Sequence, residues 1–206
     1  MSTSARTYNG KSAQQRATER RARLVDAAID VLAEHGEAGA TMTAICNRAR
    51  LTERYFYESF PNRSEALLAA MDHVAAEIAG DAVRVLTETP GAPEERVRAV
   101  MTSFIAYLVR EPAKGLVVVV HASISPALRS RRHELLESFA ALVSTEAAEL
   151  YGDDAWPPER AQIHGLVYIS GLAELFGAWL TGRVTLSEDQ LVQTASDLFV
   201  AMARRP

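Results

Sequence analysis

Apolar residues recur at the spacing of an α-helix in almost every segment of this chain, and no other feature constrains its fold as strongly. The segment "RATERRARLVDAAIDVLAEHG" shows the pattern first. Its apolar residues follow the i, i+3, i+4, i+7, i+8 order of one helical face: Leu24, Ala27, Ala28, Val31 and Leu32. Gly36 closes the segment, and glycine commonly follows the last residue of a helix. The pattern predicts an amphipathic helix that ends at Gly36.

Capping and turn residues divide the rest of the chain into further helices. Thr41 or Thr43 can cap a short helix that ends near Arg50, and Thr52 can cap a third that Pro61 ends. Longer helices are predicted over about residues 63–86, 94–110, 127–151, 158–183 and 188–204. The run "GLVVVVHAS" favours a strand locally, but a lone strand would have no partner, so we predict a buried helix there. The predicted fold class is all-α.

The stretch "LTERYFYESF" must satisfy two different surroundings, because four of the fourteen aromatic residues alternate there with charged ones. At about 100° per residue, Phe56 and Phe60 fall on one side of a helix, and Arg54 and Glu58 fall on the other. We expect the two phenylalanines to be buried against apolar residues of the preceding helices: Leu24, Ala28, Val31, Ile45 and Ala49. Two short helices joined by a tight turn, the second with an exposed polar face, are typical of a helix-turn-helix.

Charge is distributed unevenly along the chain. The net charge is −4, but residues 1–63 carry ten Lys and Arg against seven Asp and Glu, and the first 25 residues carry six against one. A basic end favours contact with a polyanion, although a solvated charged tail explains the same pattern. We expect a disordered basic arm over residues 1–15, a helix-turn-helix domain over 16–63 with its second short helix at about 52–60, and a larger helical domain over 64–206.

Several functional classes lack support. The single cysteine, Cys46, is expected to be a small core residue and not a redox sensor. We predict no metal, no cofactor and no catalytic residue, since no metal-ligand spacing or nucleotide-binding motif occurs; a small all-α enzyme with an apolar pocket is the weaker alternative. The N-terminus lacks a secretory signal, and the longest strongly apolar run, residues 116–120, is too short to cross a membrane. The expected location is the cytoplasm, without membrane contact.

The segment "TMTAICNRARLTERYFYESFPNRSEALL" resembles the N-terminal domain of the TetR family of transcriptional regulators, over about residues 18–70. The matching positions are Thr43, Ile45, Thr52, Phe56, Tyr57, Phe60 and Arg63. The resemblance implies a homodimer on a palindromic double-stranded DNA operator, with recognition helices in major grooves roughly 34 Å apart. It also implies that a small hydrophobic effector binds residues 64–206 and releases the DNA. A repressor is therefore expected, with an activator or a dimeric scaffold as alternatives.

Three residues depart from the family pattern. Arg50 stands in the turn, where glycine is usual, so the turn must accept arginine or shift, or else Arg50 offers a phosphate contact. Glu53 suits the first turn of a helix but repels phosphate, and it can accept a hydrogen bond from a cytosine amino group. Tyr55 replaces a small residue and can reach a thymine methyl group or a sugar.

The candidate DNA contacts fall into three groups. Hydroxyl groups and a cation near helix ends are expected to position phosphates: Thr43, Thr52, Tyr57 and Arg63. Arg54 is the candidate for reading a base, because a guanidinium can bind guanine through two hydrogen bonds. The arm is expected to follow the DNA backbone or minor groove through Arg16, Arg20 and Arg21. The alternatives are that the threonines only cap helices and that the arginines are solvated.

Two further sets concern the larger domain. Apolar residues on the last two helices are expected at a dimer interface, or else within an internal helix pair: Gly171, Leu175, Ala178, Trp179, Leu191, Leu198, Phe199 and Met202. Aromatic, polar or flexible residues on otherwise apolar helices are candidates for an effector pocket, or else for the core: Met101, Phe104, Tyr107, Leu108, His121, Phe139 and Tyr168.

Overall fold

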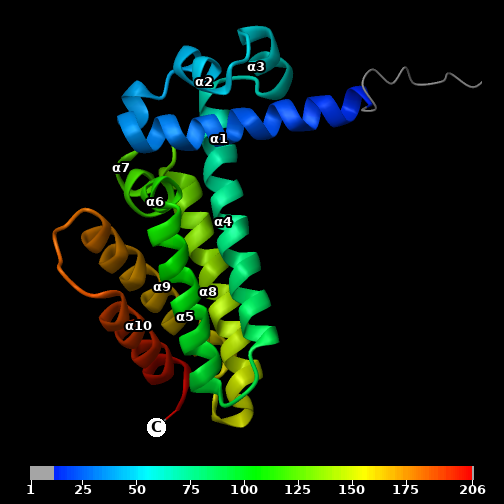
Figure 1. The fold of residues 1–206 in the computed structure, drawn as a ribbon. Helices are drawn as coiled ribbons and strands as arrows, with labels where there is room; N and C mark the ends of the chain where they lie inside the picture. Colours follow the sequence, from blue (N-terminus) through cyan, green and yellow to red (C-terminus); the bar gives the residue numbers. More distant parts are fainter. Residues whose placement is uncertain (1–11, 206) are drawn as a thin grey trace, which may run out of the picture. The chain divides into compact units, whose positions relative to one another are not determined.

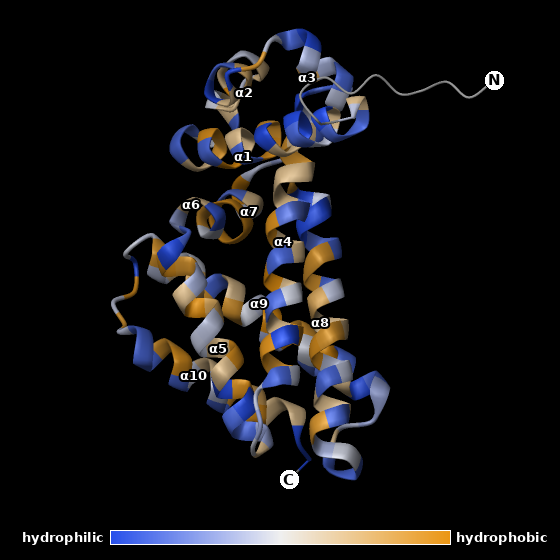
Figure 2. Cartoon of the chain, turned by 45° about the vertical axis from the view of Figure 1, so that its right-hand side comes forward, coloured by the Kyte–Doolittle hydropathy of each residue, from blue (hydrophilic) through white to orange (hydrophobic). Residues whose placement is uncertain are grey.

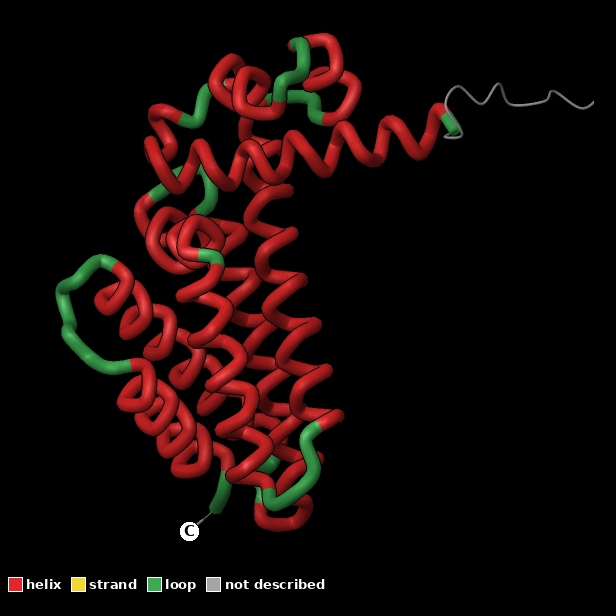
Figure 3. The backbone as a smooth tube through the Cα atoms, in the orientation of Figure 1, coloured by secondary structure: helices red, strands yellow, loops and turns green. Residues whose placement is uncertain are grey.

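The structure of the chain is a computed structural model that describes residues 12–205. These residues form helices joined by loops, and Figure 3 draws every regular element of the described range as a helix. The predicted all-α fold is therefore confirmed. Residues 1–11, most of the predicted arm, lie outside the described residues.

The chain divides into two compact units, one ending at His73 and the other beginning at Val74. The boundary falls inside helix α4 (Arg63–Glu88), beyond the expected boundary at residue 63. Four residues in the first turns of α4 are buried, which explains why these turns belong to a compact unit and not to a linker: Ala66, Leu67, Ala70 and Met71.

Helix α1 (Ala13–Gly39) begins earlier than predicted because a capping box starts it. The Ser12 hydroxyl accepts a hydrogen bond from the Gln15 backbone N–H at 3.1 Å, and the Gln15 side chain accepts one from the Ser12 N–H at 2.7 Å. Helical structure therefore replaces the last residues of the predicted disordered arm. As a further correction, three arginines lie on α1 and not in a segment that precedes it: Arg16, Arg20 and Arg21.

The apolar face of α1 is buried as predicted, at Leu24, Ala27, Ala28, Val31 and Leu32. The regular helix stops at Gly36, whose φ of 65° lies in the left-handed region that glycine adopts without strain. A short turn over residues 37–39 follows, and the Ala40 N–H donates to the Gly36 carbonyl oxygen at 3.0 Å. The predicted stop at Gly36 is confirmed.

Helices α2 (Met42–Ala49) and α3 (Glu53–Ser59) pack on each other and on α1, and together they form the predicted helix-turn-helix. The Thr41 hydroxyl accepts a hydrogen bond from a backbone N–H of α2 at 3.1 Å, so Thr41 is the cap and Thr43 lies inside the helix. Thr52 occupies the N-cap position of α3, but its side chain makes no capping hydrogen bond.

The rings of α3 divide between core and surface as predicted. Phe56 and Phe60 are only 0% and 3% exposed, and their ring centroids lie 5.7 Å apart. Tyr57 is 60% exposed, and Tyr55 is half-buried. One face of this seven-residue helix therefore holds it to α1 and α2, while the other faces outward.

The unit that begins at Val74 is a helical bundle, in which hydrophobic and hydrophilic residues alternate along the helices (Figure 2). After the end of α4 its main helices are α5 (Pro93–Arg110), α8 (Arg129–Tyr151), α9 (Pro158–Leu180) and α10 (Glu188–Ala203), labelled in Figure 1. Helix α9 packs against α8 and α10, and α10 also packs against α5. A single 3₁₀ turn, η2 (Gly152–Asp154), follows α8.

The valine run is helical, as predicted. It forms η1 (Leu116–His121), a π-helix between the short helices α6 (Pro112–Gly115) and α7 (Ala122–Ile124). Val117 and Val119 are buried. The π form was not predicted, because it differs from an α-helix by only one residue per hydrogen-bonded ring, a difference that apolar spacing does not reveal over six residues.

Helix α9 approaches its neighbours closely through glycine. A Cβ atom on Gly165 would lie 2.6 Å from the Ala140 carbonyl oxygen of α8, and one on Gly177 would lie 3.3 Å from a Val119 methyl carbon. A Cβ atom on Gly171 would meet nothing within 4 Å, and Gly171 is exposed. The space beside Gly171 is therefore open within the described part of the chain.

Helix α9 is also the one helix among the described residues with the length and apolar composition of a membrane span, although residues 116–120 had been the longest run considered. Core helices of soluble proteins have the same length and composition, so these two properties do not assign α9 to a membrane. Only 28% of its most apolar window is buried. Ile163, Leu166 and Val167 are 62%, 41% and 58% exposed, so α9 presents an uncovered apolar face.

Candidate functional site

The turn between α2 and α3 is closed by an arginine in a conformation that arginine rarely adopts. Arg50 has φ 52° and ψ 45°, and it is the only residue other than glycine with a positive φ in the described range. Its N–H donates to the Asn47 carbonyl oxygen at 3.1 Å, and the Leu51 N–H donates to that of Cys46 at 3.0 Å. The tight turn thus accepts arginine, which leaves the Arg50 side chain exposed.

The outward face of the helix-turn-helix is polar and carries both arginines and carboxylates. Six of the predicted DNA-contacting residues are exposed on it: Thr43, Arg50, Thr52, Glu53, Arg54 and Tyr57. The Arg54 side chain is 83% exposed, and the Thr52 hydroxyl is not used in capping. Hydroxyl and guanidinium groups on a short exposed helix can bind phosphates and base edges.

Arginines of α1 lie against rings of α3. The Arg20 guanidinium carbon lies 4.4 Å from the Tyr55 ring centroid, and that of Arg21 lies 4.7 Å from the Phe60 centroid. An arginine over an aromatic face is attracted by the ring quadrupole. These two side chains therefore help to hold α3 on α1, a role that sequence spacing did not indicate. Arg16, nearer the start of α1, is half-buried.

Arg63 has a structural role at the start of α4. Its guanidinium donates to the Glu37 carbonyl oxygen at 2.7 Å, and lies 3.5 Å from the Glu37 carboxylate. Arg23 similarly donates to the Ala49 carbonyl oxygen at 2.5 Å. Such bonds satisfy carbonyl groups in the last turns of helices, which have no partner within the helix. The sequence predicts that Arg63 contacts a DNA phosphate. It does not identify Arg23, because only the fold brings Arg23 close to α2.

Three groups near this face have shifted pKa values: Glu34, Arg48 and Cys46. A hydrogen bond from Arg48 at 2.9 Å lowers the pKa of the Glu34 carboxyl, and Glu34 in turn raises the pKa of Arg48. Burial, with a contribution from the Glu53 carboxylate, raises the pKa of the Cys46 thiol. Cys46 is 3% exposed and therefore a core residue, as predicted.

The predicted effector residues are scattered over several helices and do not line one described cavity. Met101 and Tyr168 are brought together, since the Tyr168 hydroxyl donates to the Ala195 carbonyl oxygen at 3.0 Å and lies 3.6 Å from the Met101 sulfur. Phe104 packs on Phe176 with ring centroids 5.1 Å apart. The remaining candidates lie on α5, η1 and α8, with Leu108 fully buried: Tyr107, Leu108, His121 and Phe139.

A polar cluster inside this unit was missed by sequence reasoning. The Tyr107 hydroxyl and the Lys114 ammonium both donate to one carboxylate oxygen of Glu77, at 2.9 and 2.7 Å. Burial and the Glu77 carboxylate raise the pKa of Tyr107. One turn along α4, the Asp81 carboxylate accepts a hydrogen bond from Ser103 at 2.6 Å. The i, i+4 spacing of the two acids was the only signal in the sequence.

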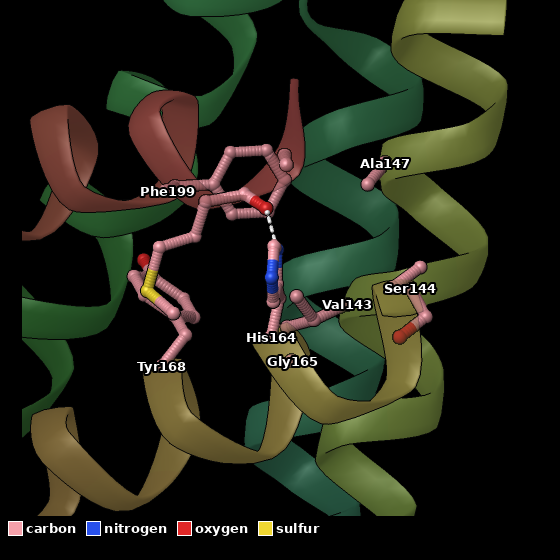
Figure 4. Close-up of a pocket in the computed structure, with 10 residues that line it drawn as sticks. Val143, Ser144, Ala147, His164, Gly165, Tyr168 and Phe199 are labelled. Carbon is pink, nitrogen blue, oxygen red and sulfur yellow. Dashed lines mark hydrogen bonds between the residues drawn. The ribbon is translucent and has the colours of Figure 1, made fainter. Parts of the chain in front are cut away.

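A small cavity lies between α8, α9 and α10 (Figure 4). His164 crosses it, with its Nδ1 atom 2.8 Å from the Met202 carbonyl oxygen. The free volume is about 10 Å³, room for about one water molecule. Of the predicted effector residues only Tyr168 lines it, together with Phe199 and Met202 from the predicted dimer set.

The predicted dimer residues separate into core and surface. Leu191 and Phe199 are buried within the single chain, so both belong to its own core, which corrects their assignment to an interface. Gly171 and Leu198 are exposed. Half-buried positions complete the set: Leu175, Ala178, Trp179 and Met202. No group of three or more His, Cys, Asp or Glu side chains within residues 12–205 is placed to hold a metal ion.

Comparison with known proteins agrees with this geometry. Residues 24–71 match the family described as bacterial regulatory proteins, tetR family. These residues include the end of α1, all of α2 and α3, and the first turns of α4. The matched segment is therefore the helix-turn-helix built above.

Regulators of transcription are similar to this chain over most of its length. The HTH-type transcriptional regulator BetI of Burkholderia thailandensis is 29% identical over 169 residues, which cover 80% of this chain and 82% of BetI. The regulator FadR of Bacillus subtilis, solved in complex with stearoyl-CoA, has a TM-score of 0.71 at 16% identity, with 88% and 97% of the two chains covered. AibR, solved with isovaleryl coenzyme A and operator DNA, has a TM-score of 0.62 at 16% identity, with 87% and 97% covered.

The two solved structures share the fold of this chain, while the matched helix-turn-helix and the similarity to BetI identify its class. Residues 24–71 therefore form a DNA-binding domain of the TetR type, and the chain is similar to a transcriptional regulator along most of its length.

Proposed function

We propose that this regulator is a repressor, a homodimer that reads a palindromic operator with α3 and leaves it when a small hydrophobic effector binds the unit beginning at Val74. The observation that carries the DNA-reading role is the outward face of α3, with Arg54 and Tyr57 exposed while Phe56 and Phe60 fix the helix from behind. Because the family consists of regulators, the alternative of a small enzyme is set aside.

The proposed DNA contacts follow the exposed groups. The hydroxyls of Thr43, Thr52 and Tyr57 and the guanidinium of Arg50 are accessible to phosphates, and Arg54 is accessible to a base. Glu53 and Tyr55 contact base edges or sugar beside it. Three arginines are proposed to contact the DNA backbone while they keep their contacts within the protein: Arg20, Arg21 and Arg63. Arg16 is proposed to reach the adjacent phosphates from α1.

The proposed dimer uses the uncovered apolar face of α9 together with Leu198 of α10. Ile163 and Val167 are both more than half exposed, at 62% and 58%, an unusual exposure for neighbouring large apolar residues. Gly171 lies on the same helix with open space beside it, so a second helix can approach it. Val167→Glu should yield a monomer in analytical ultracentrifugation, whereas Val83→Glu, at a 39% exposed position of α4, should leave a dimer.

The proposed effector is hydrophobic, and acyl-CoA thioesters are the first class to test. Two structural relatives were solved with such compounds, stearoyl-CoA and isovaleryl coenzyme A. Pockets for ligands of this kind usually have about 300–1,000 Å³. The cavity in Figure 4 would admit an acyl chain only after α8, α9 and α10 had separated, which would couple binding to a change in this unit.

The deciding experiment measures fluorescence anisotropy of the protein with DNA from its own upstream region and with a shuffled control, between about 50 and 200 mM salt. Phosphate contacts should lower the affinity by about 10³–10⁵-fold across that range. Preference for the upstream DNA, and its loss on adding an acyl-CoA, would support the proposal. Equal weak binding to both DNAs would contradict operator reading at that site. Since the proposed target is chromosomal DNA, we place the protein in the cytoplasm.

A further inference from the structure

Glu58 lies between two arginines on the surface of the helix-turn-helix. Its Oε1 atom lies 3.1 Å from Nε of Arg54, one helical turn earlier in α3. Its Oε2 atom lies 3.5 Å from an Nη atom of Arg20 in α1. Arg20 is in turn held by the Tyr55 ring, 4.4 Å away. The four side chains form a continuous series that begins at an aromatic ring and ends at the most exposed of these cations.

The atom through which Arg54 is bound decides what remains available. Glu58 takes the Nε–H, and neither terminal Nη group of Arg54 bonds to any residue in the described part of the chain. Two terminal NH₂ groups in one plane form the fork that binds guanine O6 and N7 end-on. With 83% of the Arg54 side chain exposed, that fork faces solvent.

We propose that Glu58 is a positioning residue that holds Arg54 extended along α3 and presents its terminal fork to a guanine in the operator. This inference rests on the proposed DNA-reading function. An arginine side chain loses much rotamer freedom when it is fixed, so a side chain fixed before binding loses less when it meets the base. The carboxylate also lies 3.5 Å from the Arg20 guanidinium, which is itself placed over the Tyr55 ring.

The negative charge of Glu58 weakens non-specific DNA binding, whereas its contact with Arg54 favours binding to the operator. A carboxylate on the outward face of α3 repels the phosphate backbone of every DNA equally. Glu58 therefore weakens non-specific binding while it favours binding to the correct base. Its role is to raise the ratio of the two affinities, which a charge count alone would not predict.

Two substitutions separate the positioning role from the charge. Glu58→Gln removes the charge but keeps a side-chain oxygen able to accept from Arg54 Nε, whereas Glu58→Ala removes both. Both should raise affinity for shuffled DNA by the same factor. The preference for the operator should fall about five- to tenfold in Glu58→Ala, part of the discrimination that a two-bond contact to guanine supplies, and by less in Glu58→Gln. Glu65→Ala and Glu65→Gln, at an exposed acid in the first turn of α4, serve as matched controls and should leave the preference unchanged.

Anisotropy titrations of all variants on operator and shuffled DNA decide between the explanations, with circular dichroism to verify folding. The order wild type, Glu58→Gln, Glu58→Ala in operator preference supports positioning. Equal effects of the two substitutions on both DNAs would show that only charge matters and would overturn the inference, as would an unchanged preference. A wild-type protein that does not prefer the operator would instead contradict the proposed function, and the inference would fall with it.

Discussion

Arg50 combines a strained backbone with an exposed cation, and three substitutions there separate the two properties. Its φ of 52° and ψ of 45° place a side chain with a Cβ atom in the left-handed region. Arg50→Gly removes both the strain and the charge. Arg50→Asn removes the charge and tolerates the conformation, while Arg50→Ala removes the charge and keeps the strain.

The expected change in the free energy of unfolding follows from the conformation. A left-handed residue other than glycine costs about 1–2 kcal/mol, and glycine at the same place makes the unfolded chain more flexible, which offsets about 0.5–1 kcal/mol. Arg50→Gly should therefore stabilise the protein by about 0.5–1 kcal/mol, and Arg50→Asn by a similar amount. Arg50→Ala should change stability by less than about 0.5 kcal/mol.

DNA binding should group the same variants differently. If Arg50 contacts a phosphate, each of the three variants releases one counterion fewer on binding DNA. The negative slope of log affinity against log salt should then become shallower by about 0.9 in each. Urea unfolding followed by circular dichroism measures the first effect, and anisotropy titrations at several salt concentrations measure the second. An Arg50→Gly protein less stable than Arg50→Ala would refute the strain argument. A wild-type slope in all three would refute the phosphate contact.

Three further predictions concern other parts of the chain. Combining Arg54→Ala with Tyr57→Phe should weaken operator binding by at least about tenfold with little change in urea midpoint, since both side chains are exposed; full affinity in anisotropy would contradict their roles. Gly165→Ala should destabilise the protein by about 1–3 kcal/mol, because its Cβ atom would lie 2.6 Å from a carbonyl oxygen. Gly80→Ala, where a Cβ atom would meet nothing within 4 Å, should stabilise it by about 0.5–1 kcal/mol. Equal urea midpoints of the two variants would be inconsistent with the close approach at Gly165. The pKa of Tyr107 is raised above its usual 10.0, so its phenol ionises at a lower pH in the unfolded chain than in the folded protein, and stability should hold below about pH 10 and fall above it. Tyr107→Phe should make that fall shallower in urea midpoints measured from about pH 8 to 11. An unchanged fall would exclude Tyr107 as its cause.

The parts of the fold that the sequence predicted are those in which local pattern and packing agree. The stripe from Leu24 to Leu32, the stop at Gly36 and the burial of Phe56 and Phe60 each follow from helical spacing or from glycine chemistry. The same spacing cannot show which contacts form between segments distant in sequence. Arg20 lies 38 positions before Glu58, and only the packing of α1 on α3 brings them together.

The candidate site was predictable in its exposed residues and not in its supporting ones. The exposure of Arg54 and Tyr57 was predictable because both lie on the polar side of one short helix. The sequence could not distinguish effector-binding residues from core residues, because apolar spacing is identical for a pocket wall and for a core. Leu108 is fully buried, and the polar cluster around Glu77 joins three helical segments whose contacts no local pattern encodes.

The π-helix over Leu116–His121 bears on how this segment tolerates insertions and deletions. Each i→i+5 ring holds one more residue than an α-helical ring, so the segment contains one residue in excess of a regular helix. Deleting one of its valines would let the segment continue as an α-helix from Pro112 to Ile124 without moving the residues at either end far. In an alignment of related chains, a one-residue gap within these six positions would therefore mark a change of helix type and not a change of fold.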